Sequence, residues 1–161
     1  MTKKKVEALI QQPEGRNIEF KEALPKKVDL NKTIVAFAND AGGILILGIK
    51  DKPRTVVGIP EEELFELEEK ISTSIHDTCA PVILPDISFM KVEGKHILVV
   101  KIAKGNNPPY HIKVKGGEQG TYIRVGSSNR LAGREMIEEL NRKRSNISFD
   151  SLPVYDSMSF S

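Results

Sequence analysis

Residues 36–51 constrain the fold more than any other stretch of the chain, because they combine a helix end, a glycine turn and a buried strand. Apolar residues leading into this stretch recur at spacings of three and four, which is typical of one apolar helix face. Gly42 and Gly43 then give the backbone the freedom that a tight turn requires. The apolar run from Ile44 to Ile49 is short and continuous, which predicts a strand buried on both faces.

Asp51 follows this central strand directly. One interpretation is that the strand delivers a carboxylate to the edge of the sheet. The alternative is an ordinary turn, because Asp-Lys-Pro is favourable turn chemistry. The stretch by itself favours the turn, and both interpretations stay open.

The other elements follow from periodicity and from capping residues. Helices are expected over 2–12, 29–39, 60–79 and 131–144, with Thr2 and Asp29 as N-caps of the first two. Strands are expected over 17–22, 86–92, 95–103 and 121–125, and Glu93-Gly94 joins the middle two as a hairpin. We predict one domain over residues 1–145 and an extended tail or linker over 146–161.

The core is expected on the inward faces of these elements. We predict that it contains Ile18, Phe20, Ile34, Phe37, Leu45, Leu47, Leu67, Ile71, Ile97, Val99 and Ile137.

The charge balance excludes a chain that is basic over its whole surface. There are 24 basic and 22 acidic residues, which give a formal net charge of +2, so any site for a polyanion must be a local patch. The single cysteine, Cys79, excludes an internal disulfide and fits a reducing compartment. No apolar run is long enough for a bilayer. We therefore expect a cytoplasmic protein without a membrane partner.

Three carboxylates are candidates for one site. Glu19 points away from the face of Ile18 and Phe20, Glu14 precedes that strand, and Asp51 ends the neighbouring one if the two strands pair. Such carboxylates, with Lys21 beside Glu19, could hold Mg²⁺ or Mn²⁺ and activate water against a phosphodiester. The alternative is a set of solvated charges at strand edges, with Glu19 and Lys21 as a surface ion pair.

Basic and hydroxyl side chains are candidates for phosphate contacts. The Gly126-Ser127-Ser128 turn offers amides and hydroxyls, and we expect a helix just beyond it, an arrangement that can cradle a phosphate or be a plain strand-to-helix turn. Lys3–Lys5 and Arg142–Arg144 are further basic groups. The residues predicted to bind nucleic acid are Lys26, Lys27, Lys113, Lys115, Arg124, Ser127, Ser128, Arg130 and Arg134.

Four segments together resemble one known family, the Schlafen-type AlbA-like domain found at the start of bacterial regulator-type proteins. They are EGRNIEFKE (14–22), AFANDAGGILILGIKD (36–51), VGI (57–59) and YIRVGSS (122–128). The resemblance implies an α+β fold with a mixed, largely antiparallel sheet flanked by helices. It also implies catalytic roles for Glu14, Glu19, Lys21 and Asp51, since Schlafen nucleases carry three carboxylates and a lysine at the matching places.

The resemblance has two departures. The eukaryotic nucleases form a clamp from two such lobes, whereas this chain has one, and their zinc-binding cluster has no counterpart here. The first hypothesis is therefore a nucleic-acid-binding module of a transcriptional-regulator type, acting on DNA or RNA and able to form a homodimer. The second is a ribonuclease that uses Mg²⁺ or Mn²⁺. The third is ATP or nucleotide binding, although no Walker A motif is present.

Overall fold

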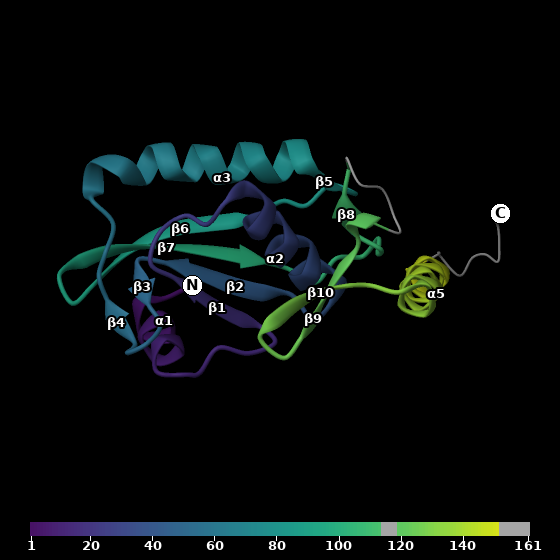
Figure 1. Ribbon diagram of the computed structural model, residues 1–161, viewed down its shortest axis with the longest axis horizontal. Helices are drawn as coiled ribbons and strands as arrows, with labels where there is room; N and C mark the ends of the chain where they lie inside the picture. Colours follow the sequence, from purple (N-terminus) through teal and green to yellow (C-terminus); the bar gives the residue numbers. More distant parts are fainter. Residues whose placement is uncertain (114–118, 152–161) are drawn as a thin grey trace.

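A four-stranded sheet with the order β1-β2-β7-β6 forms the centre of the molecule, which we describe from a computed structural model (Figure 1). β1 (Ile18–Lys21) runs parallel to β2 (Gly43–Leu47). β7 (Lys95–Ile102) runs antiparallel both to β2 and to β6 (Asp86–Val92). The sheet is thus mixed and mostly antiparallel, and the predicted α+β class is confirmed. The structure describes residues 1–113 and 119–151, and of residues 145–151 only the backbone.

Helices cover both faces of this sheet (Figure 1). α2 (Lys27–Asn39) and α3 (Leu64–Thr78), which follows the 3-10 turn Glu61–Glu63, bury their apolar sides in a cluster with Leu45, Leu47 and Leu98. α1 (Lys3–Ile10) covers the opposite face, where Val6 and Ile10 pack with Ile18 and Phe20. Side chains alternate along each strand, so successive residues of β2 pack alternately in the α2–α3 cluster and in the α1 cluster.

Three two-stranded sheets complete the described fold. β3 (Ile49–Lys50) pairs with β4 (Thr55–Val56), and β5 (Cys79–Ala80) pairs with β8 (His111–Ile112). β9 (Tyr122–Val125) pairs with β10 (Ser128–Leu131), and this hairpin lies against α2.

Most local predictions agree with the structure. Thr2 caps α1 by accepting a hydrogen bond from the Lys5 amide, and Glu93-Gly94 joins β6 to β7. α2 begins at Lys27, so Asp29 lies in its first turn and is not its N-cap. Nine of the eleven predicted core residues are buried, whereas Leu67 and Ile137 are only partly buried.

The central strand ends earlier than its apolar run predicts. Gly48 has a φ of +99°, a left-handed conformation that glycine adopts easily, and its carbonyl oxygen accepts bonds from the amides of Val57 and Gly58. The chain therefore leaves the four-stranded sheet at Gly48. Asp51 is carried into the turn between β3 and β4, which is the turn interpretation of Asp-Lys-Pro.

The C-terminal part also differs from prediction. The segment 128–131 is a strand, and the last helix, α5 (Arg134–Ser151), starts three residues later than expected and continues past residue 145. Residues 146–151 are therefore helical, where an extended tail was predicted, and residues 152–161 lie outside the described part. The domain boundary at residue 145 stays a prediction. Over the described ranges, no helix is long and apolar enough to cross a membrane.

Candidate functional site

A buried arginine, Arg124, is the centre of the candidate site. Its side chain has 0% exposure, and its guanidinium donates to Oε1 of Glu19 at 2.8 Å. Strand alternation places Glu19 on the α2 side of β1, opposite Ile18 and Phe20. β9 brings Arg124 to the same side, where its guanidinium also lies over the Phe37 ring. Both charged side chains of this pair are buried, and burial of a charge is tolerated when the charge is paired and hydrogen-bonded.

Every arm of the Arg124 guanidinium has a partner. It donates to the backbone carbonyl oxygens of Gly15 and Arg16 and to Oδ1 of Asn129. Asn129 in turn donates to the hydroxyl of Thr33 on α2. The side chain is therefore enclosed, and each of its guanidinium nitrogens has a protein partner, so this structure does not present Arg124 to nucleic acid.

The first of two pockets beside Arg124 is the polar pocket, of about 250 Å³. It brings together Glu19 and Lys21 from one predicted set and the Ser127-Ser128 turn from the other, more than 100 positions later in the sequence. Nζ of Lys21 lies 3.7 Å from Oε2 of Glu19. The polar pocket is lined by Glu19, Lys21, Pro25, Asp29, Thr33, Ser127, Ser128 and Asn129.

The second is the basic pocket, of about 300 Å³. Arg16, Lys104 and Lys143 reach it from β1's approach, the end of β7 and α5, so three cations far apart in sequence meet there. Arg16 forms a two-bonded ion pair with Asp40, which raises the pKa of Arg16 by hydrogen bonding and by charge attraction. The basic pocket is lined by Arg16, Asn39, Asp40, Ala41, Lys104, Gly105, Pro108 and Lys143.

Arg124 links the two pockets. Its guanidinium holds the backbone of Arg16 on one side and the side chains of Glu19 and Asn129 on the other. The geometry of both pockets therefore depends on one buried side chain.

Glu14 and Asp51 do not join Glu19. Oε2 of Glu14 accepts a hydrogen bond from the backbone amide of Phe20, so this carboxylate covers the outer edge of β1. Asp51 binds Arg54, whose guanidinium lies 3.8 Å over the Phe20 ring, on the sheet face opposite Glu19. The expected convergence of three carboxylates is thus not found. Within the described ranges, no group of three or more His, Cys, Asp or Glu side chains is placed to hold a metal ion.

The remaining predicted nucleic-acid contacts are scattered. Lys26 and Lys27 begin α2, Arg130 is exposed on β10, and Arg134 opens α5. Lys113 reaches the carbonyl oxygen of His76 near the end of α3, and Lys115 lies outside the described residues. The Gly126-Ser127-Ser128 turn leads into β10, so the helix expected just beyond this turn is not found there.

Sequence reasoning did not assign four charged residues of the two pockets to a site. Asp29 was interpreted as a cap, and Asp40, Lys104 and Arg16 were not singled out. Arg16 lies inside the EGRNIEFKE segment and Asp40 inside AFANDAGG. Both segments carry the family resemblance, and this was the sequence evidence that could have pointed to the two residues. Lys104 gives no signal, because isolated lysines are common at surfaces. Lys143 lies within the basic group Arg142–Arg144, a predicted candidate for phosphate contacts.

A comparison with known protein families places most of this chain in one family. Residues 14–133 match the family described as Schlafen, AlbA_2. The chain belongs to this family. The match includes the Arg124–Glu19 pair and every polar-pocket residue, and of the basic pocket it leaves out only Lys143.

Several proteins resemble this member of the family. A Ureaplasma parvum protein, named an uncharacterized ATP-binding protein, is 31% identical over 87 residues, which are 52% of this chain and 24% of that protein. The N-terminal domain of a Nitrosomonas europaea protein, named as related to the ATP-dependent DNA helicase RecG, has a TM-score of 0.56 at 28% identity, covering 79% of this chain and 90% of that one. The DIP2311 protein of Corynebacterium diphtheriae shares the fold, with a TM-score of 0.58 at 23% identity, over 79% of this chain and 27% of that protein. The chain thus spans about a quarter of the Ureaplasma and Corynebacterium proteins.

Proposed function

We propose that this Schlafen AlbA_2 domain binds nucleic acid, with backbone phosphates in the basic pocket and the strand continuing toward the polar pocket. The convergence of Arg16, Lys104 and Lys143 carries the proposal. Asp40 offsets the charge of Arg16, and the two lysines form no ion pair with any described residue. The basic pocket therefore has surplus positive charge on a chain whose net charge is only +2.

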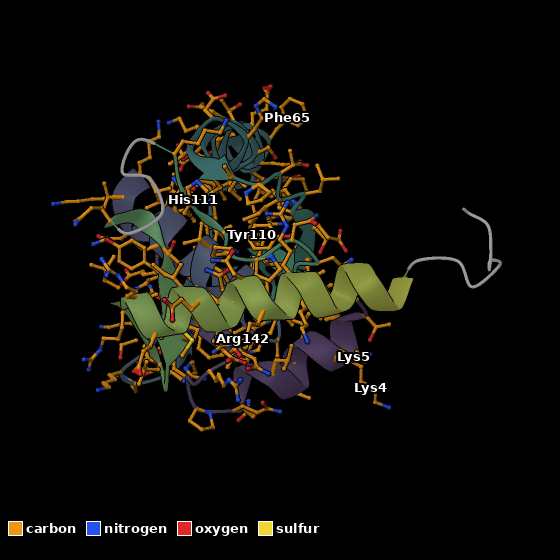
Figure 2. The ribbon with its side chains drawn as sticks, turned by 90° about the vertical axis from the view of Figure 1, so that its right-hand side faces the viewer. Lys4, Lys5, Phe65, Tyr110, His111 and Arg142 are labelled. Atoms are coloured by element: carbon orange, nitrogen blue, oxygen red, sulfur yellow. The ribbon has the colours of Figure 1, made fainter. Side chains whose placement is uncertain are left out.

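α5 extends this charge beyond the pocket. Arg142 and Arg144 are exposed on the helix that also supplies Lys143, and Figure 2 shows α5 crossing this end of the molecule. Arg142 also binds Glu139, which reduces its contribution. Few phosphates can be neutralised at once by so small a set, so we expect weak binding that depends strongly on salt.

The relatives add support of a limited kind. The Nitrosomonas protein is named for a DNA helicase, and its N-terminal domain has the same fold as this chain. A small domain attached to a helicase would bind the nucleic-acid backbone next to it. DNA or RNA, and single or double strands, are distinguished by the probes below.

The test is fluorescence anisotropy with short labelled DNA and RNA, single- and double-stranded, over a range of salt. The pair Lys104→Gln and Lys143→Gln should weaken binding to every probe and reduce the log–log salt slope by about 1 for each lysine. The matched control is Lys50→Gln with Lys52→Gln. It removes the same charge from the β3–β4 hairpin, at the far end of the molecule from α5 (Figure 1).

Equal losses in the two double variants would mean that only net charge matters, which contradicts a site at the basic pocket. Binding that is tight and independent of salt would contradict a contact dominated by phosphates.

A second candidate function, RNA cleavage assisted by Mg²⁺ or Mn²⁺, has one specific observation in its favour. Glu19 and Asp29 line the same polar pocket as Lys21. Mg²⁺ is commonly bound by one or two carboxylates together with substrate phosphates, so a protein cage of three ligands is not required. One oxygen of Glu19 is held by Arg124, and the other faces Lys21. Here the metal would supply charge neutralisation for the attacked phosphodiester.

This candidate is tested by metal-dependent cleavage of labelled RNA and by the metal-induced rise in melting temperature with RNA present. Asp29→Asn should remove both effects. Asp51→Asn serves as the control, because Asp51 lies on the other face of the sheet and should leave both unchanged. Cleavage that survives Asp29→Asn but not Asp51→Asn would refute this assignment.

A further inference from the structure

The outer edge of β6 pairs with no other strand in the part of the chain that the structure describes. β6 is the last strand of the sheet order, and its described partner is β7. The opposite edge of the sheet, at β1, is covered: Gly15 donates to the carbonyl oxygen of Ile18, and Glu14 accepts from the amide of Phe20. An exposed edge strand with free amides and carbonyls is a ready template for another strand.

The register shows which groups of β6 point outward. The carbonyl oxygen of His96 accepts a bond from the Ile59 amide, so the backbone of His96 faces away from β6. Its partner in the ladder, Lys91, must then face away from β7, because opposed residues of an antiparallel pair alternate between bonded and non-bonded pairs. The same alternation turns the amides and carbonyls of Phe89 and Ile87 outward. Among the described residues, none of these three backbones has a hydrogen-bond partner.

The side chains along this edge are unusually apolar for an open strand. Phe89 is 41% exposed, and Ile87 is partly buried against the α2–α3 cluster. Ile87, Phe89 and Lys91 share that face of β6, while Met90 and Val92 pack on the α1 face. Asp86 and Lys91, one near each end of the strand, are its two charged side chains, and charges on an edge discourage pairing.

We propose that the β6 edge binds the β6 edge of a second copy of this chain, antiparallel, to form one continuous eight-stranded sheet across a two-fold axis. Phe89 is the middle of the three outward residues, so a two-fold axis through it makes the edge self-complementary. The Phe89 amides and carbonyls then bond to each other, and Ile87 of one copy lies opposite Lys91 of the other.

The side chains fit this register. The two Phe89 rings face each other across the strands, a pair that is favourable in antiparallel sheets. Each Lys91 lies opposite an isoleucine, along which its aliphatic stem can pack, so the two ammonium groups are not opposed. A register shifted by two residues would lose the Phe89 pair. These features favour a second copy over an unrelated extended peptide.

The test is the mass of the chain in solution, measured by sedimentation from micromolar to millimolar concentration. Wild type should approach twice the mass of one chain. Phe89→Pro should stay a monomer, because proline removes the outward amide at the axis without removing a bond to β7. Phe65→Ala is the matched control: it removes a phenyl ring that is 70% exposed on α3 and not on β6 (Figure 2), and the variant should dimerise like wild type.

A second variant covers the case in which Phe89→Pro does not fold. Phe89→Asp keeps the amide but places two carboxylates opposite each other at the axis, which should also prevent pairing. Amide exchange at Phe89 should slow as concentration rises in wild type, while the amide of Ser88, which faces β7, stays protected throughout. A wild type that is monomeric at millimolar concentration, a dimer that persists in either folded variant, or assembly into larger species would each overturn the proposal.

Discussion

Replacing Arg124 by methionine should destabilise the protein more than any surface substitution. The change removes a side chain with no solvent exposure and leaves four acceptors without their donor. Two of these are the backbone carbonyl oxygens of Gly15 and Arg16, and one is the carboxylate of Glu19, which is only 10% exposed. Among the described residues, Lys21, at 3.7 Å, is then the remaining ion-pair partner of Glu19.

The magnitude follows from the burial of the pair. Removing one partner of a buried ion pair costs about 3–5 kcal/mol, because the other charge stays buried without compensation. For a domain of this size, about 2–4 °C of melting temperature is lost for each kcal/mol, which gives a decrease of about 6–20 °C. Arg124→Lys should fall between wild type and Arg124→Met, since an ammonium keeps the charge but cannot reach all four acceptors with a planar fork.

The assay is urea unfolding and thermal unfolding of both variants beside Arg16→Ala. Arg16 is 65% exposed, so its pair with Asp40 should contribute only about 0–1 kcal/mol. The double variant Glu19→Leu with Arg124→Leu should recover part of the loss, because an apolar pair leaves no buried charge. If Arg124→Met costs no more than Arg16→Ala, the buried network does not stabilise the site and the reasoning is refuted.

Two further predictions concern the core. Phe37→Ala should cost about 3–5 kcal/mol in urea unfolding, because Phe37 has 0% exposure and fills the space over Gly43, whereas Phe65→Ala should change stability by less than about 0.5 kcal/mol. Burial raises the pKa of the Cys79 thiol from 9.0 to about 12, against a smaller opposing effect of Lys113. Above pH 9 the unfolded chain loses a proton that the native protein keeps, so stability should fall by up to about 1.4 kcal/mol per pH unit as the pH rises toward 12. The difference in unfolding free energy between wild type and Cys79→Ala, measured below and above pH 9, isolates this contribution. If this difference does not change with pH, the prediction is contradicted.

Local signals predicted most of the secondary structure. The apolar spacing of α2 and α3, the Glu93-Gly94 hairpin and the apolar run after Gly43 each depend on neighbours in sequence, and the structure has all of them. Gly48 shows where this reasoning ends. It sits inside a continuous apolar run, and only its positive φ ends the strand there. Asp51 therefore lies in the β3–β4 turn that its Asp-Lys-Pro sequence favours, on the sheet face opposite Glu19, and the expected convergence with Glu19 is not found.

The candidate site was predictable in its parts but not in its assembly. Alternation along β1 correctly separated Glu19 from Ile18 and Phe20 and placed Lys21 on the same side as Glu19. The partner of Glu19 is 105 residues away, and no local pattern gives that distance. One signal was available: Arg124 shares a strand face with Tyr122, which packs in the core, so a buried arginine was the consistent interpretation of YIRV.

The position of Arg124 between the two pockets also separates the proposed functions from each other. Of these two pockets, Lys104 and Lys143 line the basic pocket and Asp29 lines the polar pocket, so their substitutions should act on binding and on metal-dependent chemistry independently. Arg124 holds the backbone of Arg16 and the carboxylate of Glu19 with one guanidinium. Arg124→Lys should therefore impair both activities in a protein that still folds. Loss of one activity with the other at its wild-type level would show that the two pockets are positioned separately.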